Sequence, residues 1–477
     1  MSDALTEGLA RFVCDASSAP IGEAGQDKVK KVVADTFAAI LAGAGSDVAS
    51  PVFGFAAASG IGSVPVLGTA LALPPTGAAL VHGTCGAALD FDDVLSMMPG
   101  HPAAIILPAL LSGHDGQRVD GATLLDAYVI GLEAGSKLSQ GVGLGHYMRG
   151  FHASGTLALF CGVGALARLR RLDHAQTRTA FGIAASTASG LQANFGTMTK
   201  PFHSGWAAQS SVTAVDLASR GFTASQSIFE ADRGFIDAYG TDKSDPSVVL
   251  PMLGDPWTIL DPGVALKKFP TCYATHRAID GLTRIEARVG RLLAQLDRVV
   301  CRVAPKALRP LPFPRPETGL ESKFSMPHAL AAALYFDTLR IASFSDAAVR
   351  IPEIRELYER IEVIEDMACV EGDPEWDNKS YGTRGFVRIE AHLADGRVET
   401  ERVNVPPGHP KRELGWDDLE SKFSDCGQSC GLPDDRLSRT FERLRALENE
   451  ADIATLVEEL TSGARLATPL RSRVSDA

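Results

Sequence analysis

Four short segments, far apart in the chain, set acidic, basic or imidazole side chains among glycines and other small residues. Such side chains exchange protons or hold anions, and glycine lets the backbone approach a ligand closely. The first segment, residues 88–102 (ALDFDDVLSMMPGHP), has three aspartates within four residues, beginning with Asp90, and a following histidine, His101. Like charges this close raise the pKa of at least one carboxyl unless cations lie nearby. The pattern fits solvated aspartates at a helix end, a metal site, or a site in which one aspartate handles a proton or orients a neighbour.

Two further segments supply cationic and imidazole side chains. Residues 145–156 (GHYMRGFHASGT) contain Tyr147, Arg149 and His152 just before an expected helix, whose free N–H groups suit an anion. Residues 194–205 (NFGTMTKPFHSG) place Lys200 and His203 on either side of a proline, ahead of an Ala- and Ser-rich segment that predicts a buried helix at 210–221. A lysine that faces a buried region needs an anionic partner, such as a bound carboxylate. A lysine that reaches solvent from a loop and histidines of an ordinary core are the competing explanations.

The fourth segment, residues 267–281 (KKFPTCYATHRAIDG), places His276 at the start of an expected helix, close to an expected domain junction. Ligands often bind between domains, although a surface histidine at a helix start fits the same pattern. If the four segments converge, they form a cationic pocket that suits a small polycarboxylate. A base there would remove the proton next to a carboxylate, while lysine and histidine stabilise the resulting enediolate charge.

The elements that must position these groups divide the chain unevenly. Residues 1–264 show helical periodicity, with small and apolar residues nearly all round several helices, which indicates helices buried against helices. Residues 265–405 are of α+β character, with strands expected at 296–303 and 361–365 and a hairpin at 386–405 around Asp395-Gly396. Residues 406–465 return to helix and complete the first domain. We therefore predict a mainly α protein with a large all-helical domain and a smaller α+β lid domain.

Composition excludes several classes of protein. The 477 residues carry 46 Lys and Arg against 58 Asp and Glu, a net charge of −12, which argues against a nucleic-acid partner. No apolar run reaches about 18 residues and no secretory signal is visible, so we expect neither a membrane partner nor export. The eight cysteines are scattered, and only Cys426 and Cys430 are close. They indicate reduced thiols in a cytoplasmic protein rather than a zinc site.

Several strings together resemble one known family. The MmgE/PrpD family is similar to this chain over roughly residues 5–460, and its members include 2-methylcitrate dehydratases, cis-aconitate decarboxylases and iminodisuccinate epimerases. The resemblance implies a homodimer with no metal or other cofactor and a catalytic pocket between the helical domain and the lid. The strings that carry it are ALDFDD with the following HP, GFHASGT, FGTMTKPFHSG, KKFPTCYATHRAIDG and TGLESKFSMPHALAAAL.

The resemblance also implies roles for single residues. By motif, Asp90, His101, Lys200 and His276 would be catalytic. The string that contains Tyr147, Arg149 and His152 lines the same pocket in similar proteins, and His203 is nearby, so these four would bind substrate.

Two departures from the family pattern leave the reaction open. This chain has Ala87 where members often have histidine, and Val94 where many have threonine. We expect a cofactor-independent lyase, a decarboxylase or dehydratase, acting on a small di- or tricarboxylate such as cis-aconitate or 2-methylcitrate. An epimerase of an iminodisuccinate-like amino dicarboxylate is the alternative, and a non-catalytic metabolite-binding homologue is a third hypothesis.

Overall fold

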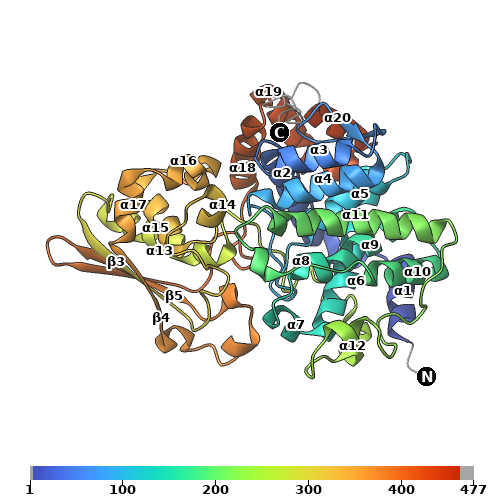
Figure 1. The fold of residues 1–477 in the computed structure, drawn as a ribbon, viewed down its shortest axis with the longest axis horizontal. Coiled ribbons are helices and arrows are strands. Elements are labelled where there is room, and N and C mark those ends of the chain that lie inside the picture. Colours follow the sequence, from blue (N-terminus) through green and yellow to red (C-terminus); the bar gives the residue numbers. More distant parts are fainter. Residues whose placement is uncertain (1–3, 462–477) are drawn as a thin grey trace, which may run out of the picture.

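Apolar helices pack against one another in the larger of two lobes (Figure 1). The computed structural model describes residues 4–461. Small residues let these helices approach closely, and every residue of α5 is buried although Pro108 lies inside it. A short hairpin of β1 (Val64–Pro65) and β2 (Ala72–Leu73) also belongs to this part of the chain. The helices are α1 (Leu5–Asp15), α2 (Gly22–Ala44), α3 (Ala49–Ala57), α4 (Pro75–Ala88), α5 (Ala103–Gly113), α6 (Gly121–Val142), α7 (Gly145–Met148), α8 (Ala153–Thr156), α9 (Ala158–Leu169), α10 (His174–Ala185), α11 (Thr199–Ser219) and α12 (Phe235–Tyr239).

The smaller lobe is built on a four-stranded sheet with the order β4-β3-β5-β6. Strands β3 and β4 are parallel, whereas β5 pairs antiparallel with both β3 and β6, so the predicted strands and the hairpin are confirmed. Helix α13 packs on β5 and β6, and α15 packs on β4, which gives this lobe its own apolar core within residues 274–393. The elements are α13 (Tyr273–Val289), β3 (Leu296–Val303), α14 (Gly319–Ser322), α15 (Met326–Tyr335), α16 (Asp346–Val349), α17 (Pro352–Tyr358), β4 (Ile361–Glu365), β5 (Val387–Leu393) and β6 (Val398–Val403).

The last helices, α18 (Trp416–Ser429), α19 (Asp434–Arg445) and α20 (Ala454–Thr461), return to the larger lobe. There α18 and α19 pack on α2, and α20 contacts β1 (Figure 1). Their apolar residues join a core drawn mainly from residues 5–266. The protein is thus mainly α with a smaller α+β part, as predicted. Residues 462–465 of the expected helical return lie outside the described residues.

Helix α11 begins earlier than the sequence suggested. It starts at Thr199, so Lys200 and His203 lie in its first turns and not in a loop ahead of a helix at 210. The misleading residue is Pro201, which breaks a helix interior but is tolerated in the first turn, where its missing N–H has no intrahelical partner. Both side chains are therefore carried by a buried helix.

A close crossing of two helices brings Lys200 to Asp90. A Cβ atom added to Gly205 of α11 would lie 2.3 Å from the carbonyl oxygen of Leu80 in α4, and one on Gly83 would lie 2.8 Å from the Cα of Gly205. Only glycine permits this approach of the two backbones. Because Asp90 lies two residues after the end of α4 and Lys200 lies in the first turn of α11, the crossing sets the distance between them.

Among residues 4–461, no single helix is long and apolar enough to cross a membrane. The pair Ala19–Ala44 and Ala49–Ala57, bent by 87°, meets the length and composition requirement when taken together.

The glycine crossing yields a stability prediction. We expect Gly205→Ala to lower the free energy of unfolding by about 1–3 kcal/mol, because the added methyl overpacks the contact with α4. The matched control is Gly86→Ala in α4, whose added Cβ meets its nearest atom at an ordinary 3.4 Å. Urea unfolding monitored by circular dichroism measures both changes, and a Gly205→Ala protein as stable as Gly86→Ala would contradict the crossing.

Candidate functional site

Asp90 is held by two buried lysines from different parts of the chain. Its carboxylate receives Lys200 Nζ at 2.5 Å on Oδ1 and Lys267 Nζ at 2.8 Å on Oδ2. All three side chains are almost completely buried. Asp90 has a φ of 52°, a left-handed conformation that aspartate adopts more readily than most residues. Burial alone would raise the pKa of Asp90, but the two ammonium groups hold it well below its ordinary value.

The two lysines differ in the number of N–H donors that remain free to bind a ligand. An ammonium group has three N–H donors. Lys267 Nζ contacts the Asp90 carboxylate, the Asp90 carbonyl oxygen at 3.0 Å and Asp92 Oδ1 at 3.4 Å, so its donors are engaged. Among the described residues, Lys200 Nζ donates only to Asp90. Lys200 therefore keeps donors for an anion.

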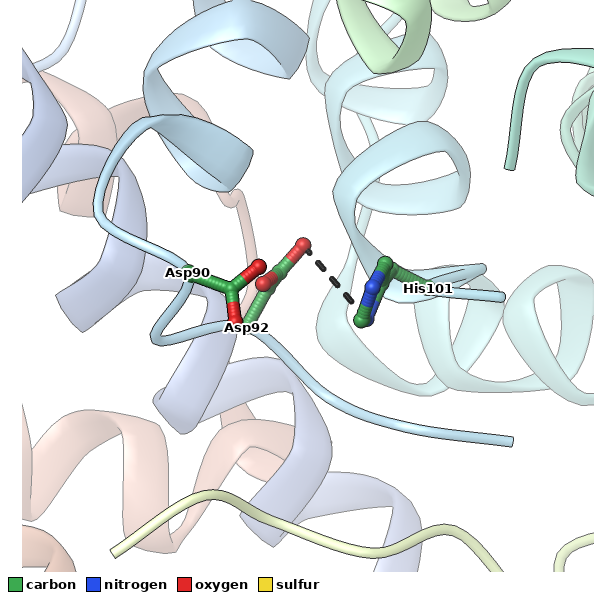
Figure 2. Close-up of side chains that lie close together, drawn as sticks. All are labelled: Asp90, Asp92 and His101. Carbon is green, nitrogen blue, oxygen red and sulfur yellow. Dashed lines mark ion pairs between the residues drawn. The ribbon is translucent and has the colours of Figure 1, made fainter. Parts of the chain in front are cut away.

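His101 faces the same carboxylates with one fixed tautomer. Its Nδ1 lies 2.5 Å from the carbonyl oxygen of Asp93 and 3.8 Å from Asp92 Oδ2 (Figure 2). A carbonyl oxygen only accepts hydrogen bonds, so the proton is on Nδ1 and Nε2 carries the lone pair. Burial lowers the pKa of His101 to about 4, which keeps the ring neutral at pH 7. His101 Nε2 is thus a fixed proton acceptor.

Asp90, Lys200, Lys267 and His101 line a cavity of about 70 Å³, whose wall includes residues of both lobes. Two buried polar atoms of its lining residues, His152 Nε2 and the Tyr273 hydroxyl, have no hydrogen-bond partner among the described residues. Unpartnered buried polar atoms are costly and mark places where a ligand or water completes the bonding. The lining residues are Asp90, Val94, Pro99, Gly100, His101, Tyr147, His152, Phe195, Lys200, Lys267, Cys272, Tyr273, Ala274, Pro310, Phe324, Ser380, Gly382 and Thr383.

Five of the eight predicted site residues meet at this cavity: Asp90, His101, Tyr147, His152 and Lys200. The other three do not line it. His203 lies behind His152, and its Nδ1 is 3.0 Å from His152 Nδ1. Arg149 turns away and donates to the Gly240 carbonyl oxygen at 3.0 Å. His276 is buried, and its Nε2 donates to the Thr271 carbonyl oxygen at 3.2 Å.

Other lining residues were missed by the sequence reasoning. Lys267 begins the motif KKFPTCYATHRAIDG, where the pair Lys267-Lys268 looks like two solvated lysines. In the structure Lys267 is buried, whereas the Lys268 side chain is 45% exposed. Ser380 and Thr383 arrive from the smaller lobe, more than a hundred residues away, and no local pattern marks them.

The acidic string does not suit a metal ion in this arrangement. Ligand atoms of Asp90, Asp92 and His101 lie within 4.8 Å of one another, as they would around a metal. However, both Asp90 oxygens accept from ammonium groups, and His101 Nδ1 is protonated toward a carbonyl oxygen. The lysines supply the positive charge that a cation would otherwise bring.

A larger hollow of about 1020 Å³ lies elsewhere, against α1, α6, α9 and α10. Several of its charged groups pair with one another, as Arg168 does with Asp126 and His174 with Asp15. None of the predicted site residues lines it.

Comparisons with known proteins identify the family of this chain. The model of the MmgE/PrpD N-terminal domain matches residues 7–247, and that of the MmgE/PrpD C-terminal domain matches residues 269–444. The chain is 28% identical to a cis-aconitate decarboxylase of Homo sapiens over 394 residues, which cover 80% of this chain and 79% of the relative. It is 24% identical to a cis-aconitate decarboxylase of Aspergillus terreus, with 84% of each chain covered. The two domain models together span most of the sequence, and the protein belongs to the MmgE/PrpD family.

Proposed function

We propose that the protein is a cofactor-independent lyase that acts on a small di- or tricarboxylate, with cis-aconitate as the first candidate. The observation that carries the proposal is the set of unused polar groups at the cavity: the spare donors of Lys200, the lone pair of His101 Nε2, and the unpartnered His152 Nε2 and Tyr273 hydroxyl. The carboxylates of such a ligand would accept from Lys200 and from the Tyr273 hydroxyl, while His101 Nε2 would accept a proton from the ligand. The relatives named cis-aconitate decarboxylase support the choice of substrate class.

The same groups account for the chemistry. Dehydration and decarboxylation both create negative charge on a carbon next to a carboxylate, the first by proton removal and the second by loss of CO2. Lys200 would hold the carboxylate onto which this charge spreads, in a buried setting where such a contact is strong. His101 Nε2, a fixed acceptor, would take the proton in a dehydration. Asp90 would orient the Lys200 ammonium.

The size of the cavity implies that the smaller lobe moves. Ligand pockets usually measure about 300–1,000 Å³, whereas this cavity measures about 70 Å³. Ser380, Gly382 and Thr383 of the smaller lobe form part of the wall, and Phe324 forms another part. We infer that these residues withdraw for a substrate to bind and then close over it, which excludes water from the reacting carbon.

Val94 bears on specificity. It lines the cavity, where the family pattern often has threonine, so the wall is apolar at this point. A substrate hydroxyl or carboxylate that would bond a threonine loses that contact here. Because this contact can change which substrate binds, cis-aconitate is only the first candidate, and 2-methylcitrate must be tested beside it.

The experiment that tests this function follows candidate substrates by proton NMR in D2O. Cis-aconitate, 2-methylcitrate and iminodisuccinate are each incubated with the enzyme. We expect loss of CO2 with one solvent deuterium on the product carbon, or loss of water, for one of the first two. Deuterium exchange without loss of CO2 or water would instead favour an epimerase, and no change in any compound would refute catalysis on this substrate class.

A matched pair of substitutions tests which histidine exchanges the proton. If the substrate loses water, His101→Gln should lower kcat about 10²–10⁴-fold, as loss of a general base does, because His101 lines the cavity. His276→Gln should keep kcat within about tenfold of the wild type, because this buried side chain does not line the cavity and glutamine preserves a donor to Thr271.

Steady-state kinetics with the substrate identified above measures both variants. Equal losses would contradict the assignment of His101 and would restore His276 as a direct participant.

A further inference from the structure

His152 and His203 form a pair of imidazoles that runs outward from the cavity. His152 precedes α8, His203 lies in α11, and their Nδ1 atoms are 3.0 Å apart. The backbone at Gly190 passes directly over the pair, with a φ of 139°, and a Cβ there would lie 3.2 Å from the His203 ring. His152 also donates its backbone N–H to the Gly190 carbonyl oxygen at 3.0 Å. The glycine thus leaves room for the two rings to meet.

The bond between two Nδ1 atoms contains a single proton. If His152 Nδ1 carries it, His152 Nε2 presents a lone pair to the cavity; if His203 Nδ1 carries it, His152 Nε2 presents a proton. Burial lowers the pKa of His203 to about 4 and that of His152 well below its ordinary value, and Lys200 adds to both shifts. Both rings are therefore neutral at pH 7, and the pair changes state by moving protons without becoming charged.

The two ends of the pair have different surroundings. His152 is 1% exposed, and its Nε2 is enclosed without a partner. His203 is 6% exposed. Its Nε2 also has no hydrogen-bond partner among the described residues, but this atom is not enclosed by protein. His152 therefore lines the cavity with an enclosed, unpartnered Nε2, whereas His203 Nε2 reaches toward solvent. His101 differs, because its Nδ1 proton is fixed on a carbonyl oxygen.

We propose that His152 donates a proton to the substrate carbon and that His203 resupplies it from water. The inference rests on the proposed lyase function, and it favours decarboxylation, the reaction that consumes a proton. The C–C bond to the departing CO2 breaks, and its electron pair remains on the substrate carbon. That carbon takes the Nε2 proton of His152, and His152 Nδ1 takes the Nδ1 proton of His203. His203 Nε2 then takes a proton from water, and the hydroxide that remains combines with the released CO2 as bicarbonate. His152 thus acts as the catalytic acid, and His203 is a positioning residue that acts through it.

Replacement of His203 tests the relay. His203→Gln keeps a hydrogen bond to His152 but cannot pass a proton, so kcat should fall at least tenfold while KM stays within twofold. His203→Ala should show a similar fall that added imidazole partly reverses. The matched control is His174→Gln, the same change at an exposed histidine of α10, which should leave kcat unchanged. A His203→Gln enzyme with wild-type kcat would overturn the relay, as would a His203→Ala enzyme that imidazole does not rescue.

A second measurement does not depend on turnover, so it separates failure of the relay from failure of the proposed function. Nitrogen-15 NMR of histidine-labelled wild-type protein at pH 7, assigned with the His203→Gln and His152→Gln variants, reports the tautomers. The relay predicts two neutral rings, with one protonated and one unprotonated Nδ1 between them. Two identical tautomers, or a charged ring, would overturn the relay even if the lyase function holds.

Discussion

The ion cluster of Asp90, Lys200 and Lys267 is the interaction on which the site depends. Three charges are removed from water together, and a buried charge left without its partner costs several kcal/mol. The geometry that satisfies them requires α11 to cross α4 at glycine contact and the segment before α13 to return to the same point. The cluster therefore ties together the larger lobe and the junction with the smaller one. It also leaves Lys200 with donors that face the cavity.

A second buried pair supports the first and explains why the chain returns to the larger lobe. Lys422 of α18 contacts Asp35 of α2 at 2.6 Å, and it also donates to the carbonyl oxygens of Phe91 at 2.7 Å and Lys267 at 3.0 Å. One side chain of the C-terminal helices thus holds both backbone segments that carry the Asp90 cluster. The C-terminal return is part of the support of the site as well as of the apolar core.

The sequence predicted regular elements well, because their signals are local. Alternating apolar residues and the Asp395-Gly396 turn suffice for β3 to β6, with β3 and β4 found at their expected bounds. The expected start of α11, at residue 210, was wrong, because the helix begins at Thr199 and accommodates Pro201 in its first turn. The motifs led to five residues of the cavity wall, but residue type does not reveal direction. Arg149 turns to a backbone carbonyl and His276 to another, whereas Lys267 and Tyr273 point inward. Such directions come from packing between segments distant in the chain.

The central claim is that Lys200 holds a substrate carboxylate with the N–H donors that Asp90 does not use. Calorimetric titration with propane-1,2,3-tricarboxylate, a saturated tricarboxylate that has no double bond to react, tests it most directly. A hydrogen bond to a charged group contributes about 1.5–3 kcal/mol, so Lys200→Met should raise Kd roughly 10- to 150-fold. The same change at the exposed Lys268 should leave Kd within about twofold. Equal affinities for the wild type and Lys200→Met would contradict the account.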